Sequence, residues 1–125
     1  MKDYKGKKEA EQTDVVDDLL KQPVKNLEDR VKQLENEIKD RLNLNIDTLS
    51  KLGTQQLFFK ERARQLHYTA PFTTKSQFEI ETARLEVQKN REMLDCFRDI
   101  SRLQEQLRES TEELKRERLK LKLTE

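Results

Sequence analysis

Glycine, proline and cysteine are scarce in this sequence, and each shortage excludes something. Two glycines and two prolines in 125 residues leave few places to turn, so we expect long uninterrupted elements and no glycine-rich phosphate-binding loop. A single cysteine excludes an internal disulfide framework and is typical of an intracellular protein, cytoplasmic or nuclear. The longest apolar run, Leu57-Phe58-Phe59, is too short for a secretory signal or a membrane span.

Apolar residues are also few. Hydrophobic residues make up 33% of the chain and charged residues 41%, against about 45–50% and 25% in ordinary globular domains. Such a chain is either disordered or built from helices that share a narrow core with partners. Disorder usually accompanies a high net charge, whereas here 26 basic and 25 acidic residues are interspersed and nearly cancel. We therefore expect a coiled coil, and the near-zero net charge disfavours nucleic acid as the main ligand.

The strongest periodic signal lies in residues 76–122, which contain no proline and no glycine. Its first residues, Ser76-Gln-Phe-Glu79, form a capping box that predicts the start of a long helix. The apolar positions of this helix fall on two stripes at coiled-coil spacing that differ in phase. The first stripe is Ile80, Ala83, Val87, Leu94 and Phe97, and the second is Ile100, Leu103, Leu107, Leu114 and Leu121. Asn90 interrupts the first stripe, either as a buried amide that fixes register or as a solvated residue.

A second long helix is predicted over residues 23–68. Its heptad positions are Val24, Leu27, Val31, Leu34 and Ile38, followed after a slip in phase by Leu42, Ile46, Leu49 and Leu52. Such a slip locally unwinds a supercoil. Gly53 either ends this helix or lies inside it at a cost of about 1 kcal/mol, and we favour a continuous or slightly kinked helix.

The remaining segments are short. Residues 1–12 have no apolar periodicity and are expected to form a mobile charged tail, and residues 13–22 a short amphipathic helix that ends before Pro23. Pro71 marks a turn over residues 69–75, and residues 123–125 form a second tail. The two long helices have equal predicted lengths, so the fold class is all-α: an elongated antiparallel helical hairpin, or coiled coil, within a multi-helix bundle that includes partner chains. A kinked rod that pairs in parallel with another chain is the alternative.

The predicted hairpin has a definite register. A fold-back at the middle of the 69–75 turn places Val31 beside Leu114, Leu42 beside Leu103 and Leu52 beside Met93. The same register places Asn90 close to Gln55. The slip in the first helix then faces the change of stripe in the second, which an antiparallel pair requires if both seams are to stay in contact.

Apolar and aromatic residues gather around the turn, and we predict that they form a partner interface: Leu57, Phe58, Phe59, Tyr68, Phe72 and Phe78. Local packing of the turn onto the hairpin is the competing interpretation. Phe58 and Phe59 are adjacent and therefore about 100° apart on a helix. We predict that one of the two packs inside the hairpin while the other anchors a partner.

No residue pattern indicates catalysis, a cofactor or a metal. His67 is the only histidine, and Cys96 beside Phe97 is interpreted as a small packing residue. The basic residues between Lys115 and Lys122 suit a helix C-terminus and are expected to lie beside acidic residues of the N-terminal segment. The sequence thus predicts no enzyme and no small-molecule substrate.

The function that these features favour is that of a structural, scaffolding coiled-coil subunit in a larger intracellular assembly. It would act by helix pairing with other coiled-coil subunits, hetero-oligomers being favoured over homo-oligomers. The alternative is a nucleic-acid-associated coiled-coil dimer that uses its basic termini.

Overall fold

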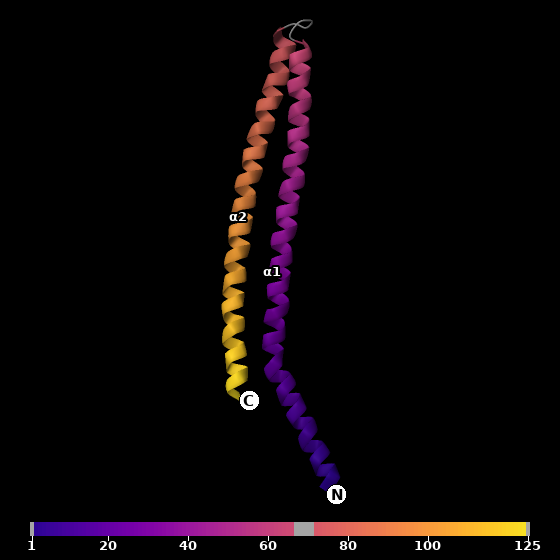
Figure 1. Ribbon diagram of the computed structural model, residues 1–125, viewed down its shortest axis with the longest axis vertical. Helices are drawn as coiled ribbons and strands as arrows, with labels where there is room; N and C mark the ends of the chain where they lie inside the picture. The colour runs from indigo at the N-terminus through magenta and orange to yellow at the C-terminus, as the bar shows by residue number, and fades with distance from the viewer. Residues whose placement is uncertain (1, 67–71, 125) are drawn as a thin grey trace. The chain divides into compact units, whose positions relative to one another are not determined.

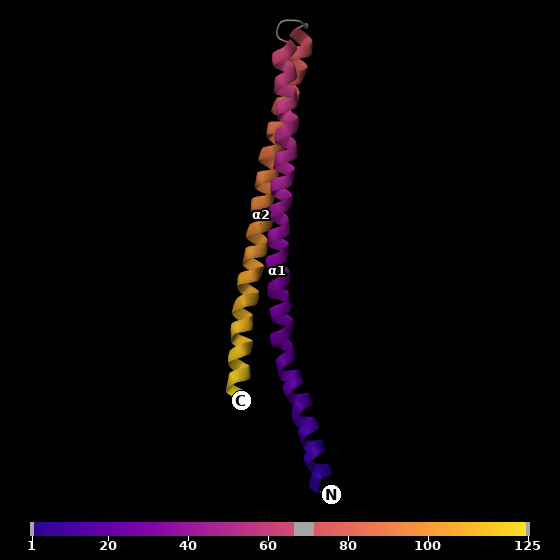
Figure 2. The same ribbon diagram turned by 45° about the vertical axis from the view of Figure 1, so that its right-hand side comes forward.

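The protein is two long helices that pack against each other in opposite directions, as a computed structural model shows (Figures 1 and 2). The structure describes residues 2–66 and 72–124, with side chains for residues 18–66 and 75–124. Helix α1 spans Lys2–Leu66 and helix α2 spans Phe72–Thr124. The antiparallel helical hairpin predicted from the sequence is confirmed.

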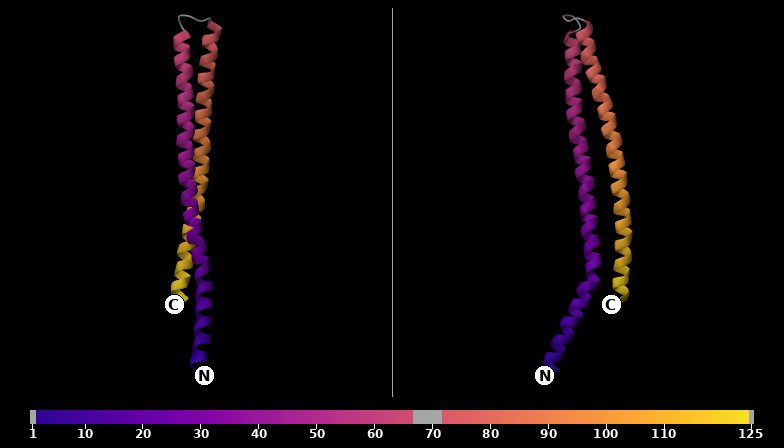
Figure 3. Two further views of the ribbon diagram at one scale, coloured as in Figure 1. Left: turned by 90° about the vertical axis from the view of Figure 1, so that its right-hand side faces the viewer. Right: turned by 180° about the vertical axis from the view of Figure 1, so that it is seen from behind.

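The helix boundaries differ from the predicted ones at both ends of the hairpin. Residues 2–12, expected to be a tail, are helical, and α1 runs through Pro23 without a break. A proline inside a helix removes one backbone hydrogen bond and clashes with the preceding turn, which kinks or breaks the helix. The indigo N-terminal part of α1 is indeed bent (Figure 3).

At the other end, α2 begins at Phe72, directly after Pro71 in the sequence, so residues 72–75 are helical and not part of a turn. Ser76 is therefore an interior residue and caps nothing, while Glu79 forms an ion pair with Lys75 at 3.7 Å. The helix also continues past the predicted end at residue 122 to Thr124.

Gly53 lies inside α1, which confirms the continuous helix. Its φ angle is not positive, and a Cβ atom placed on it would meet nothing within 4 Å. Its place in the helix therefore has no steric reason, and its effect is only the entropic cost of a glycine.

The cross-helix contacts correct the predicted register. Arg41 forms ion pairs with Asp99 and Glu92, although the predicted register places the neighbouring Leu42 beside Leu103. Likewise Phe59 packs on Phe78. The described helices leave only residues 67–71 between them, so the hairpin folds back about three residues earlier than a 69–75 turn requires, and each α1 residue meets an α2 residue closer to the turn.

The hairpin divides into two units. The open-end unit combines residues 1–37 with residues 103–125, and the turn-end unit is residues 38–102. In the open-end unit the predicted seam is in place: Leu34 is fully buried, Leu103 and Leu114 are buried, and the other members are half-buried, namely Val24, Leu27, Val31, Leu107 and Leu121. Arg118 adds an ion pair with Glu28 at 3.1 Å across the two helices.

In the turn-end unit the seam is different from the predicted one. Ile38, Leu49, Leu52 and Ile100 are half-buried as expected of seam residues. Six other predicted members are exposed: Leu42, Ile46, Ile80, Val87, Leu94 and Phe97. Polar side chains, among them Arg41 and Gln56, take part of this seam between the two helices.

Candidate partner-binding surface

A polar cluster around Arg41 occupies the interhelical seam of the turn-end unit. The Nε of Arg41 donates to Oδ2 of Asp99 and its Nη1 donates to Oε1 of Glu92, both at 2.8 Å, and Nδ2 of Asn45 donates to the same Glu92 oxygen at 3.2 Å. The Arg41 side chain is 14% exposed and that of Glu92 is 18% exposed. Because Arg41 and then Asn45 hydrogen-bond its carboxylate, the pKa of Glu92 is lowered despite the opposing effect of burial.

A second polar cluster surrounds Gln56, which is buried. Its Nε2 donates to the carbonyl oxygen of Thr82 at 3.3 Å and to Oε2 of Glu86 at 2.8 Å, and its Oε1 accepts from Nζ of Lys89 at 3.3 Å. The buried amide is therefore satisfied at both ends by α2, which is the condition under which a polar group is tolerated in a seam.

These clusters explain why Leu42 and Ile46 are exposed. The heptad phase that begins at Val24 continues without a slip through Ile38 to Arg41 and Asn45, which take the seam positions. The predicted slip at Leu42 and Ile46 is therefore wrong. Polar residues can hold the seam here because each finds a partner on α2.

The first predicted stripe of α2 does not face α1. Leu85 and Cys96 are buried against α1, together with half-buried Phe78, Lys89 and Glu92. Val87 lies two residues after Leu85, and Leu94 two residues before Cys96, so each points about 160° away from the seam. We call this outward row the outer stripe, and its members are all exposed: Ile80, Ala83, Val87, Asn90, Leu94 and Phe97.

The outer stripe keeps strict heptad spacing, with alternating steps of three and four residues, over the whole of its length. An open hollow lies on it, lined by Val87, Asn90, Arg91, Leu94, Asp95 and Arg98. Asn90 is thus on the face of α2 opposite α1, and the register that would place it near Gln55 does not apply. Phe97 is exposed, contrary to its predicted seam position, whereas Cys96 is buried, as expected of a small packing residue.

Charged rows flank the outer stripe. Arg84, Arg91 and Arg98 recur every seven residues along one edge, and Glu79 and Glu86 begin the opposite edge. Arg84 pairs with Glu81 on its own helix at 3.1 Å. Among the described residues neither Arg91 nor Arg98 has an ion pair or hydrogen bond, and both are exposed. Unpaired basic residues regularly spaced beside an apolar stripe are typical of the edge of a helix–helix interface.

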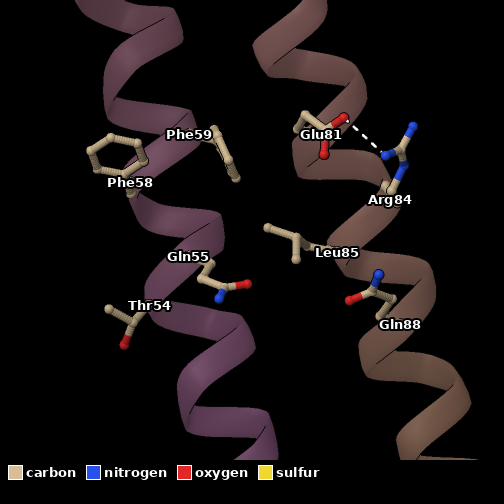
Figure 4. A pocket seen from close by; sticks show the side chains of 8 residues that line it. All are labelled: Thr54, Gln55, Phe58, Phe59, Glu81, Arg84, Leu85 and Gln88. Atoms are coloured by element: carbon tan, nitrogen blue, oxygen red, sulfur yellow. Dashed lines mark ion pairs between the residues drawn. The ribbon is translucent and has the colours of Figure 1, made fainter.

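The aromatic residues predicted as a partner interface separate into two environments. Phe59 faces α2, and its ring lies 5.9 Å from that of Phe78, while Phe58 points away from α2 and is 55% exposed with the guanidinium of Arg62 5.6 Å from its ring centre (Figure 4). Phe59 and Leu85 line a groove between the helices, and Leu57 is exposed. The two phenylalanines thus differ as expected, and the role of Phe58 in binding stays a prediction.

Some of the predicted residues cannot be placed. Tyr68 and His67 lie outside the described residues, and Phe72 starts α2 without a described side chain. In the described part of the chain no group of three or more histidine, cysteine, aspartate or glutamate side chains could hold a metal ion. Over the same residues, neither helix has an apolar stretch long enough to cross a membrane.

The chain matches no protein family, no curated protein and no solved structure. The surface itself is the basis for a function: it is an apolar stripe on α2, at heptad spacing, that points away from α1 and is bordered by charged rows. This spacing is that of a coiled-coil seam.

Proposed function

We propose that the protein is a non-catalytic structural subunit of an intracellular assembly and acts by coiled-coil pairing with another helix. The observation that supports this is the outer stripe of α2, in which Ile80, Val87, Leu94 and Phe97 are between 58% and 72% exposed. Monomeric proteins rarely expose so continuous an apolar row, and the spacing of this one fits the knobs-into-holes packing of a second helix.

The hairpin would serve as the rigid support of that stripe. Satisfied polar clusters at Arg41 and Gln56 hold α2 against α1 in one register. Between Ile80 and Phe97, α2 carries a second apolar row that faces outward, and a partner helix would complete the bundle by covering it. Among the basic residues near the C-terminus, Arg118 pairs with Glu28 and Lys120 with Glu117.

The proposal is tested by placing charges on the outer stripe. The double variant Val87→Glu/Leu94→Glu should leave the helix content of the chain unchanged, because both side chains are already exposed. It should lose association with every binding partner, because two buried carboxylates in a seam are not tolerated. The matched control is Leu44→Glu/Leu119→Glu, which makes the same changes at leucines that are 57% and 58% exposed but off the stripe.

The measurement is quantitative affinity purification of the wild type and both variants from cells, followed by reconstitution of each captured chain with purified protein. Partners bound by the wild type and the control but absent from the stripe variant support the proposal. Equal capture by all three proteins, or loss of helicity in the stripe variant alone, would overturn it.

A further inference from the structure

We infer that the occupant of the outer stripe is a second copy of this chain, bound in parallel and in register through α2. The inference rests on the proposed function and names the partner for the same surface. The inference comes from the order of charges along the two edges of the stripe. Two copies of this order are complementary when the helices are parallel and not when they are antiparallel.

The heptad positions follow from the spacing. Ile80, Val87 and Leu94 occupy the a positions, and Ala83, Asn90 and Phe97 the d positions. The arginine row is then the e edge, and Glu79 and Glu86 lie on the g edge.

In a parallel pair each g residue faces the e residue five positions later on the other helix. Glu79 of one copy then meets Arg84 of the second copy, and Glu86 meets Arg91. A parallel dimer of identical chains has a twofold axis that repeats both pairs, so four complementary pairs form between residues 79 and 91 of the two copies. In an antiparallel pair the e edge faces the e edge, which would bring the arginine rows together, and such like-charge contacts are strongly unfavourable.

The charged groups are available for these pairs. The side chains of Glu79, Arg84 and Glu86 are 58%, 62% and 53% exposed, and Arg91 has no partner among the described residues. Glu86 accepts a hydrogen bond from Gln56 of α1 at 2.8 Å and pairs with Lys89 at 3.7 Å, so its exposed carboxylate would be shared between these groups and Arg91 of the second copy. Glu79 and Arg84 already pair with Lys75 and Glu81 on their own helix, and because the Glu79 and Arg84 side chains are more than half exposed these pairs are weak.

Asn90 supports the same orientation. In a parallel, in-register pair it faces Asn90 of the second copy, and the two amides can hydrogen-bond each other across the seam. Any other register or orientation would place this amide against Val87, Leu94 or another apolar side chain and leave it unsatisfied. The hollow lined by Val87, Asn90 and Leu94 is the position at which the side chain of the second helix would insert.

The first test is the mass of the full chain in sedimentation equilibrium over a concentration series. The 15.0 kDa chain should approach twice its mass, the Leu44→Glu/Leu119→Glu control should do the same, and Val87→Glu/Leu94→Glu should remain monomeric. A wild-type chain that is monomeric at all concentrations, or a stripe variant that still dimerises, overturns the inference. If a monomeric wild type nevertheless captures a different helical chain through the stripe, only the inference fails and the proposed function stands.

Orientation is tested by cysteine cross-linking in a Cys96→Ala background. The single-cysteine variants Ile80→Cys and Leu94→Cys should each form a disulfide with themselves under mild oxidation, because every a position meets its own copy in a parallel, in-register pair. In an antiparallel pair a position can meet itself only at the centre of the overlap, so cross-linking of just one variant, or of neither, overturns the parallel arrangement.

The charge argument has its own test. Arg84→Glu/Arg91→Glu and Glu79→Arg/Glu86→Gln should each weaken self-association by about ten-fold or more, and an equal mixture of the two should restore it as a mixed dimer, while Glu86→Gln keeps an oxygen that accepts from Gln56. Arg102→Glu/Arg116→Glu changes the same charge away from the stripe and should associate like the wild type. If each variant dimerises as well alone as in the mixture, the charge rows do not select the partner.

Discussion

Replacing Arg41 with methionine should destabilise the hairpin, since Arg41 is the centre of the polar seam. Methionine keeps most of the side-chain length but removes the charge and both 2.8 Å hydrogen bonds, to Asp99 and Glu92. Glu92, which is only 18% exposed, would then be a carboxylate in the seam with Asn45 as its remaining partner.

The magnitude follows from the exposure of the three groups. A hydrogen bond to a charged group contributes about 1.5–3 kcal/mol, and removing one partner of a buried pair costs up to about 3–5 kcal/mol. The bond to Asp99 counts for less because that side chain is 42% exposed. We therefore expect Arg41→Met to lower the free energy of unfolding by about 2–4 kcal/mol. The double variant Arg41→Met/Glu92→Met should recover most of this loss, because two apolar side chains fill the seam without an unpaired charge.

The assay is urea unfolding followed by circular dichroism, at one fixed chain concentration because the proposed self-association would add to apparent stability. The wild type, both single variants and the double variant form a double-mutant cycle with an expected coupling energy of about 1–3 kcal/mol. An Arg41→Met variant as stable as the wild type, or a coupling near zero, would refute the view that the polar cluster holds α2 in register.

The same variants have a pH signature. The pKa of Glu92 in the folded protein lies below its ordinary value of 4.5, chiefly because of Arg41. Its contribution to stability is therefore complete above pH 4.5 and is lost as the pH falls through the lower, folded-state pKa. In Arg41→Met the pKa is no longer lowered by the guanidinium, so stability should depend less steeply on pH in this acidic range.

Three further outcomes are expected. Gly53→Ala should raise the free energy of unfolding by about 1 kcal/mol, because the helix has room for the Cβ atom; a loss of stability would mean that α1 is not continuous there. Phe59→Ala should cost about 2 kcal/mol or more in thermal unfolding and Phe58→Ala less than about 1 kcal/mol, since only Phe59 packs on α2; equal losses would contradict the two environments. Cys96 is buried in the seam and should react with a thiol reagent only as fast as the hairpin opens, whereas Leu94→Cys in a Cys96→Ala chain should react at once when the protein is dilute; similar rates would place Cys96 on the surface.

The sequence was sufficient for the hairpin and for the seam of the open-end unit, where apolar residues such as Leu34 and Leu114 occupy the heptad positions alone. The sequence-based prediction of the seam was wrong in the turn-end unit. It assigned seam positions to apolar residues alone and so selected Leu42 and Ile46 in place of Arg41 and Asn45. Polar residues are acceptable in a seam only when their partners are present, and the partners Glu92 and Asp99 lie on the other helix. One helix read alone cannot supply that information.

The sequence nevertheless contained one signal for the polar seam of α1 and one for the outer stripe of α2. The phase that begins at Val24 reaches Arg41 and Asn45 without a slip, and Arg84, Arg91 and Arg98 repeat every seven residues. The two stripes of α2 were recognised, but both were assigned to α1. Only the burial of Leu85 and Cys96 shows that the first stripe points elsewhere.

The two opposite faces of α2 limit how the length of this chain can change. Inserting or deleting one residue between Phe78 and Phe97 would rotate everything beyond it by about 100° and misalign the seam and the outer stripe together. A seven-residue change preserves both phases, but Arg41 would then miss Glu92 unless α1 changed by the same length. Divergent relatives should therefore differ here by whole heptads, gained or lost in both helices at once. Other insertions should be confined to the chain ends and to the connection between the helices.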